Sequence, residues 1–122
     1  MLNLTEEHRA RLSDLRESEK FAEDLAGLYP GAATPELGRE FEEHANLLIS
    51  QVSELPSDST KEDVFTLFSA TLRKFDHADT EDRERICGVC EGIMDAVGID
   101  SSEGLLNKWL YGFDPTNFDG NA

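Results

Sequence analysis

The chain has 122 residues, 39% of them hydrophobic, which is enough for one globular domain with a single core. It carries 26 acidic and 11 basic residues, a net charge of −15, and such a field repels nucleic acid and anionic membranes while it attracts basic proteins. No apolar run approaches the roughly 20 residues of a membrane span, no secretory signal follows Met1, and two cysteines three positions apart provide no disulfide framework. We therefore expect a soluble, reduced, cytoplasmic protein.

The first helical pattern begins after Thr5, a residue type that caps helix N-termini. It ends before Tyr29-Pro30-Gly31, which cannot continue a helix. The pattern leaves open whether this segment is one helix or two helices joined near Ser18. Its apolar residues lie near one stripe: Leu12, Leu15, Ala22 and Leu25.

A second helix is predicted from Thr34 as N-cap, with Pro35 in the first helical position and Glu36 in the first turn. Pro56 and the polar residues after it end the pattern. The apolar residues advance by three, four or seven positions, which predicts a continuous core face of Leu37, Phe41, Ala45, Leu48, Val52 and Leu55.

A third helix is predicted from the stretch Ser59-Thr60-Lys61-Glu62, which fits a capping box. We expect this helix to bury five apolar residues: Val64, Phe65, Phe68, Leu72 and Phe75.

A fourth helix is predicted from Asp79 or Thr80 as cap to Gly98 as the terminating glycine. Its stripe consists of Ile86, Val89, Cys90, Ile93 and Val97, with Cys87 and Met94 on the flank. A short fifth helix is expected to begin at Ser101 or Ser102, to end at Gly112 and to bury Leu105, Leu106, Trp109 and Leu110. The sequence thus predicts an all-α fold: residues 1–122 form a single-domain bundle of about five helices, with an irregular C-terminal tail at 114–122 and an irregular start at 1–4.

The pair Cys87 and Cys90 forms a Cys-x-x-Cys motif, for which three interpretations exist. A thioredoxin-type pair lies at a helix N-terminus after a strand, whereas this pair falls about two turns into a helix with acidic neighbours. Zinc requires further ligands, and the three histidines show no paired spacing. We expect both cysteines to pack in the core, with a metal- or thiol-dependent enzyme that uses them kept as an alternative.

Other chemical motifs are missing. No histidine follows a glutamate at the Glu-x-x-His spacing of di-iron bundles, and the stretch from Asp76 to Glu84 lacks the mid-loop glycine of a calcium loop. No phosphate-binding glycine loop, dinucleotide fingerprint or nucleophile elbow occurs. The sequence therefore predicts no catalytic residue, no metal and no cofactor.

The stretch from Phe75 to Pro115 resembles a family of small bacterial all-helical proteins known as a domain of unknown function. That resemblance implies the same all-helical fold and offers no catalytic residue to carry over. Small size, acidity and the lack of a catalytic motif are also similar to immunity proteins of bacterial toxin systems. The residues that carry the family resemblance are Tyr29-Pro30-Gly31, Phe75-Asp76, Thr80-Glu81-Asp82-Arg83-Glu84, Ile93-Met94-Asp95 and Ser102 through Phe113.

The leading hypothesis is an acidic immunity-type protein that binds a cognate basic toxin domain and occludes its active site. The alternative from another class is an acidic adaptor or regulator of a basic protein. We expect the partner to contact helix ends and loops, where side chains face solvent. The expected contact residues are Asp79, Glu81, Asp82 and Glu84 at the entrance of the fourth helix, and Tyr111, Asp114 and Asp119 at the C-terminal edge; a competing acidic face on the second helix consists of Glu36, Glu40, Glu42 and Glu43.

The aromatic residues of the C-terminal edge have two readings. Trp109 and Phe113 either attach the short last helix to the bundle, or part of this edge is an exposed anchor for a partner.

Overall fold

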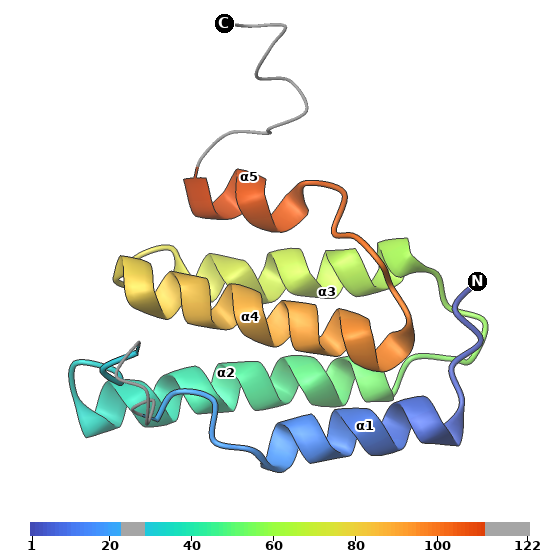
Figure 1. Cartoon of the computed structure of the whole chain (residues 1–122), viewed down its shortest axis with the longest axis horizontal. Coiled ribbons are helices and arrows are strands. Elements are labelled where there is room, and N and C mark those ends of the chain that lie inside the picture. The colour runs from blue at the N-terminus through green and yellow to red at the C-terminus, as the bar shows by residue number, and fades with distance from the viewer. Residues whose placement is uncertain (23–28, 112–122) are drawn as a thin grey trace, which may run out of the picture.

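The computed structural model describes residues 1–22 and 29–111 as an all-α, single-domain bundle, which confirms the predicted fold class (Figure 1). Within these residues there is no β-strand. The helices are α1 (Glu6–Glu17), α2 (Pro35–Ser53), α3 (Lys61–Leu72), the 3₁₀ turn η1 (Arg73–Phe75), α4 (Thr80–Val97) and α5 (Leu105–Tyr111).

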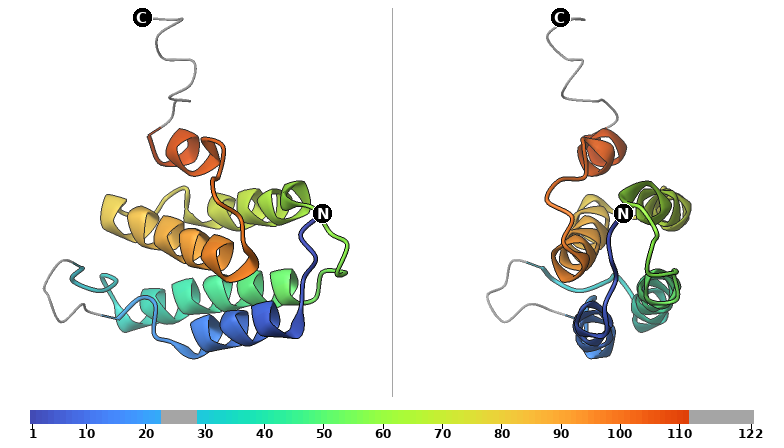
Figure 2. Two further views of the ribbon diagram at one scale, coloured as in Figure 1. Left: turned by 45° about the vertical axis from the view of Figure 1, so that its right-hand side comes forward. Right: turned by 90° about the vertical axis from the view of Figure 1, so that its right-hand side faces the viewer.

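The helices run in alternating directions along the chain, and α1 to α4 surround one core (Figure 1). Helix α1 contacts both α2 and α4, and α2 contacts α3. Helix α5 lies on top of this group and contacts α4, as the two further views in Figure 2 show. No helix in the described part of the chain is both long enough and apolar enough to cross a membrane.

The predicted N-caps of α1 and α2 are confirmed. The hydroxyl of Thr5 accepts a hydrogen bond from the backbone N–H of His8, whose imidazole accepts one from the Thr5 N–H in return. The hydroxyl of Thr34 accepts a hydrogen bond from the N–H of Leu37 at 3.1 Å. Each contact satisfies a backbone donor that the first helical turn leaves without an intrahelical partner.

The cap of α3 lies one residue later than the sequence predicted. Thr60, not Ser59, is the N-cap, and Asp63, not Glu62, completes the capping box. Ser59 is buried, and its backbone carbonyl accepts a hydrogen bond from the N–H of Leu2 at 2.8 Å. The N-terminal segment around Leu2 thus engages the backbone of Ser59, and the next residue is the cap.

Helix α1 ends at Glu17 and does not continue across Ser18. The ammonium group of Lys20 turns back and donates hydrogen bonds to the carbonyls of Leu15, Arg16 and Ser18, at 3.2, 3.0 and 2.6 Å. A cation at this position satisfies the last carbonyls of the helix and opposes the negative end of the helix dipole. Lys20 is only 6% exposed, so this cap is part of the interior.

An aromatic cluster fills one end of the bundle. The rings of Phe41 and Phe75 stack with centroids 4.8 Å apart, and Phe21 lies 5.3 Å from Phe41 and 5.8 Å from Phe75. Tyr29 meets Phe21 edge-on at 6.4 Å. Because Phe21 and Tyr29 lie outside every helix, the chain between α1 and α2 contributes directly to the core.

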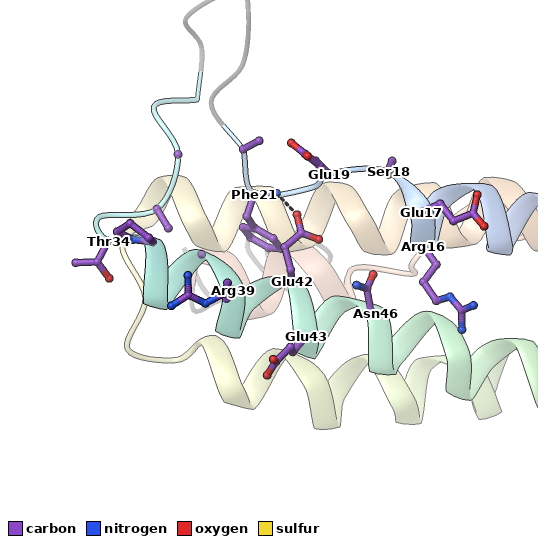
Figure 3. A pocket seen from close by; sticks show the side chains of 15 residues that line it. Arg16, Glu17, Ser18, Glu19, Phe21, Thr34, Arg39, Glu42, Glu43 and Asn46 are labelled. Atoms are coloured by element: carbon purple, nitrogen blue, oxygen red, sulfur yellow. Dashed lines mark hydrogen bonds between the residues drawn. The ribbon is translucent and has the colours of Figure 1, made fainter.

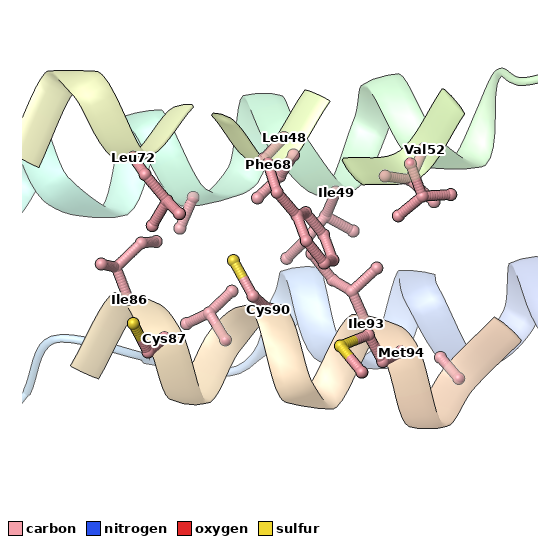
Figure 4. Packing of buried hydrophobic residues seen from close by; sticks show 14 of the residues in the cluster. Leu48, Ile49, Val52, Phe68, Leu72, Ile86, Cys87, Cys90, Ile93 and Met94 are labelled. Carbon is pink, nitrogen blue, oxygen red and sulfur yellow. The ribbon is translucent and has the colours of Figure 1, made fainter. Parts of the chain in front are cut away.

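The middle of the core forms where α2, α3 and α4 face one another (Figure 4). Leu48, Ile49 and Val52 of α2 and Phe68 and Leu72 of α3 meet the stripe of α4, and all are at most 1% exposed. The α4 stripe lies as predicted, with Ile86, Val89, Cys90, Ile93 and Val97 buried.

Helix α1 approaches α4 closely at Gly92. A Cβ atom at Gly92 would lie 3.4 Å from a terminal methyl carbon of Leu15. The small residue therefore lets the two helices lie against each other without a gap. Helix α4 then ends at Gly98, as predicted, with a φ of 82° that glycine adopts without steric cost.

The start of α5 was predicted three to four residues too early. Glu103 and Gly104 both adopt left-handed backbone, with φ of 57° and 88°, so a turn separates Ser102 from the helix, which begins at Leu105. The guanidinium of Arg83 donates hydrogen bonds to the carbonyls of Trp109 and Leu110 at 3.0 and 3.1 Å. The same group lies 4.8 Å from the centroid of the Trp109 ring, so it holds α5 against α4.

Candidate functional site

Asp82 does not face solvent, which corrects the prediction for the entrance of α4. It is 3% exposed, and its carboxylate accepts a hydrogen bond from the hydroxyl of Tyr29 at 2.6 Å. The reason lies in the helical register, since Asp82 precedes Ile86 by four residues and Val89 by seven and therefore belongs to the apolar stripe. That spacing was readable in the sequence, but the run of acidic neighbours obscured it.

The partners of Asp82 form a buried polar group next to the aromatic cluster. Burial and the adjacent Asp82 carboxylate raise the pKa of Tyr29 well above its ordinary value, so the phenol remains a proton donor at neutral pH. The guanidinium of Arg85 lies 4.7 Å from the centroid of the Tyr29 ring and donates a hydrogen bond to the carbonyl of Lys20 at 2.6 Å. This group ties α4 to the chain around residues 20 and 29.

The other three acids of the α4 entrance are exposed as predicted. Asp79 is the N-cap, and its side chain makes no capping hydrogen bond. Glu81 and Glu84 lie on the outer face of the first turns. In the described part of the chain none of these carboxylates forms an ion pair or hydrogen bond, so all three are available to a partner.

The exposed acids continue along α4 beyond the predicted entrance. We call Glu81, Glu84, Glu91 and Asp95 the acidic stripe. At 100° per residue they fall within an arc of about 80°, and they extend about 21 Å along the helix. Gly88 lies in the same arc, exposed, and a Cβ atom there would have nothing within 4 Å. The centre of the stripe is therefore open, because Gly88 has no side chain and nothing covers it.

Sequence reasoning missed Glu91 and Asp95, although the signal was present. The steps from Glu81 to Glu84, Gly88, Glu91 and Asp95 are three, four, three and four residues, which is the same period that identified the apolar stripe of this helix. The polar face carries no lysine or arginine in these positions. The period of the exposed acidic residues therefore extends the acidic surface over most of α4.

Part of the competing acidic face on α2 is engaged in contacts within the protein. The carboxylate of Glu42 accepts hydrogen bonds from the backbone N–H groups of Lys20 and Phe21, and it lies 3.2 Å from the Lys20 ammonium. Glu36 lies 3.9 Å from Arg39, and Glu40 lies 3.6 Å from His44. Of the four acids predicted for this face, Glu43 alone has no such partner among the described residues.

Figure 3 shows Glu42 between the backbone of Phe21 and the open groove beside it. This groove has a volume of about 740 Å³ and lies between the end of α1 and the first half of α2. Its charged lining consists of two arginines and four glutamates: Arg16, Arg39, Glu17, Glu19, Glu42 and Glu43. The mixed lining gives no convergent set of catalytic groups.

At the C-terminal edge, Tyr111 is the last described residue and is 59% exposed. Asp114 and Asp119 lie outside the described residues, and so does Phe113. Trp109 is half-buried, and its indole N–H donates a hydrogen bond to the Asp76 carboxylate at 2.9 Å. This contact attaches the last helix to the bundle, which is the first of the two readings for Trp109.

Several basic side chains donate hydrogen bonds to backbone carbonyls of the bundle. Arg9 donates hydrogen bonds to the carbonyls of Leu4, Ser53 and Leu55, which joins the N-terminal segment and α1 to the end of α2. The side chains of Lys20, Arg83 and Arg85 also donate to backbone carbonyls, as described above. Four of the 11 basic residues thus bind backbone carbonyls; Lys20 is buried and the other three are half-buried.

Both cysteines pack in the core, as predicted. Cys87 is 5% exposed and Cys90 is fully buried between α2, α3 and α4 (Figure 4). Burial, with smaller contributions from nearby negative groups, raises the pKa of Cys87 to about 11 and that of Cys90 further. Thiols with raised pKa values are poor nucleophiles and poor metal ligands at neutral pH. Among the described residues, no three His, Cys, Asp or Glu side chains come together in a way that could hold a metal ion.

The fold and surface define this protein as a small acidic helical bundle with a long carboxylate face. The chain belongs to the family described as "Domain of unknown function (DUF4844)", whose model matches residues 3–114. This family match confirms the resemblance read from the sequence.

One solved structure is similar over most of its length: the crystal structure of a DUF3571 family protein from Acinetobacter baumannii AYE. It is 28% identical, the TM-score is 0.74, and the match covers 86% of this chain and 89% of that chain. No protein with a curated description matches this chain.

Proposed function

We propose that this protein is an acidic immunity-type binding protein, which neutralises a cognate basic toxin domain by covering its active site. The observation that carries the proposal is the acidic stripe of α4, where Glu81, Glu84, Glu91 and Asp95 share one exposed face without ion partners in the described residues. Asp79, the N-cap of α4, adds a further exposed carboxylate at the N-terminal end of the helix.

The proposed mechanism has two stages. The net charge of −15 attracts a basic domain over a distance set by the ionic strength, about 8–10 Å at physiological salt. The stripe then fixes the docked position, because four carboxylates on a rigid helix present a regular pattern to lysine and arginine side chains. Since active sites that cleave or bind nucleic acid are themselves basic, a surface of this kind competes directly with a nucleic-acid substrate.

An acidic adaptor that binds a basic protein without inhibiting it remains the second candidate, because the same stripe would serve it. A metal- or thiol-dependent enzyme is the third, and the burial of both cysteines disfavours it. We propose the cytoplasm as the location, in keeping with two free thiols.

The proposal is tested by co-expression with the product of the neighbouring gene, followed by pull-down and by an assay of toxicity with and without this protein. Capture together with rescue of growth supports the immunity role. Capture without any effect on the partner's activity supports the adaptor instead, and failure to capture a basic protein contradicts both.

The binding face is tested by charge reversal. The variant Glu84→Lys/Glu91→Lys changes two exposed positions of the stripe, and Glu40→Lys/Glu43→Lys is the matched control on α2. We expect the α4 variant to slow association strongly and the control to slow it weakly, with the difference shrinking as salt rises. Asp82 is excluded from this test because a lysine there would be buried. Loss of binding in the α2 variant alone would show that the interface lies on α2 and not on α4.

A further inference from the structure

A groove between α3 and α5 combines apolar side chains with basic ones. Its volume is about 710 Å³, which lies within the range of small-molecule sites, about 300–1,000 Å³. Helices α3 and α5 lie one above the other in Figure 1. We call this feature the α3/α5 groove.

The aromatic side of the groove is already held in place. Phe65 and Trp109 are half-buried, and Leu72 between the two helices is buried. The guanidinium of Arg83 covers one face of the Trp109 ring, and the carboxylate of Asp76 binds its indole N–H. The sequence predicted that Phe65 would be buried, but it borders this groove instead. Because these contacts fix the indole, a ligand would meet a preformed wall and would not have to order it.

The charged lining has a positive excess. It consists of Arg73, Lys108 and Glu103, and Glu103 forms an ion pair with Lys61. The side chains of Arg73 and Lys108 are exposed and form no ion pair or hydrogen bond within residues 1–22 and 29–111. In a chain with a net charge of −15, two unpaired cations in one groove favour an anionic ligand there.

Two hydroxyl groups add neutral hydrogen-bond donors. Ser69 of α3 and Ser102 before α5 line the groove and are half-buried. Neither hydroxyl forms a hydrogen bond in the part of the chain that the structure describes. Hydroxyl, ammonium and guanidinium groups all donate hydrogen bonds to a carboxylate. The groove therefore offers four donor side chains beside an aromatic wall, and the one carboxylate of its lining is already paired.

We propose that the α3/α5 groove binds a small aromatic carboxylate. The ring of the ligand packs against Phe65 and Trp109, because aromatic side chains favour an aromatic partner. Its carboxylate is bound by Arg73 and Lys108, since a planar guanidinium donates to both oxygens at once. This inference does not depend on the proposed function, because no residue of the acidic stripe lines the groove.

The probe for this site is 3-phenylpropionate, which combines one ring with one carboxylate. A probe of about eleven non-hydrogen atoms is expected to bind with a Kd of about 1 mM. Trp109 is the only tryptophan of the chain, so its emission should shift to shorter wavelength as the probe displaces water from the groove. The neutral isostere 3-phenylpropanamide should bind about tenfold more weakly, because it lacks the charge. Propionate, which lacks the ring, should cause no shift.

The two cations are tested by Arg73→Gln/Lys108→Gln, which keeps long polar side chains in the groove. This variant should bind 3-phenylpropionate about tenfold more weakly, at the level of the amide, because the charge pairing is lost from the other side. Arg39→Gln/Lys74→Gln is the matched control, since it changes the net charge equally at exposed positions outside the lining. The control should bind the probe as the parent does.

Three results would overturn the proposal. An unchanged Trp109 emission with 3-phenylpropionate up to about 20 mM, at constant ionic strength, would mean that no ligand of this class occupies the groove. Equal affinity for the acid and the amide would mean that Arg73 and Lys108 do not recognise a carboxylate. Equal weakening in the groove variant and in its control would assign the effect to the overall charge of the protein.

Discussion

At the scale of single residues, Tyr29 and Asp82 carry the most specific polar contact of the interior. The hydroxyl of Tyr29 donates to the Asp82 carboxylate at 2.6 Å, and both residues are at most 4% exposed. A buried carboxylate that loses its donor retains the cost of leaving water without the compensating hydrogen bond. The pair therefore joins the segment before α2 to the start of α4 only while both members are present.

We predict that Tyr29→Phe lowers the free energy of unfolding by about 1–3 kcal/mol, because it leaves a buried acceptor unsatisfied. Urea denaturation followed by circular dichroism measures the change. Asp79→Asn, at an exposed carboxylate three residues before Asp82, is the control and should have almost no effect. A Tyr29→Phe variant as stable as the parent would show that Asp82 finds another donor.

The cysteines lead to a prediction about pH. Because burial raises the pKa of Cys87 from 9.0 to about 11, its thiol stabilises the folded state below pH about 9 and this contribution is lost as pH rises. The raised pKa values of Cys90 and Tyr29 act in the same direction. Stability should therefore fall from about pH 9 upward.

The double variant Cys87→Ala/Cys90→Ala should be less stable than the parent at pH 7, by about 1–3 kcal/mol in total, because it removes buried volume. Between pH 8 and pH 10.5 its stability should decline less steeply than that of the parent. Thermal unfolding at several pH values measures both effects. Equal slopes for the two proteins would mean that the thiols ionise without unfolding.

At the scale of elements, Gly88 within α4 and Gly98 at its C-cap have opposite roles. Gly88 lies within the helix on an open surface, where a Cβ atom would meet nothing within 4 Å. Gly98 ends the helix with a φ of 82°, a conformation in which a side chain is strained.

We predict that Gly88→Ala raises the free energy of unfolding by up to about 1 kcal/mol, since alanine is the better helix former. Gly98→Ala should lower it by about 1 kcal/mol, because alanine disfavours the left-handed conformation of the cap. The two variants control for each other, since both add one methyl group to the same helix. Two changes of the same sign would contradict this assignment.

At the scale of the whole molecule, like-charge repulsion dominates the surface. The ion pairs of the described residues are mostly exposed and therefore weak, as in Arg11 with Glu7 at 2.6 Å. Most of the acidic residues that the structure describes form no ion pair, and four basic side chains are bound to backbone carbonyls. Folding concentrates these carboxylates in a smaller volume than the unfolded chain does.

We predict that added sodium chloride stabilises the protein, because at 0.1 M it screens charges beyond about 10 Å. Unfolding by urea, an uncharged denaturant, should shift to higher concentration between 0.01 and 0.3 M salt. The variant Glu84→Gln/Glu91→Gln, which lowers the negative charge of the stripe, should show a smaller shift. Stability that falls with salt would mean that attraction between paired charges outweighs the repulsion.

The sequence by itself determined the helices and their apolar stripes. Caps and stripes depend on residues three and four positions apart, and such local rules operate whatever the rest of the chain does. Thr5, Thr34 and Gly98 were placed correctly for this reason, and the apolar stripe of α4 likewise. The one-residue error at Thr60 arose because Ser59 is held by a distant segment, the residues around Leu2.

Only the tertiary structure decided which polar residues belong to the interior. Lys20 and Glu42 look like surface residues by composition, yet each is held by groups far away in the chain or by backbone atoms exposed at a helix end. Phe21 belongs to the core but lies outside any helix, so no helical periodicity in the sequence could indicate its burial. The cost of burying a charge depends on the partners that packing brings within hydrogen-bonding distance, and those partners are set by how the helices meet.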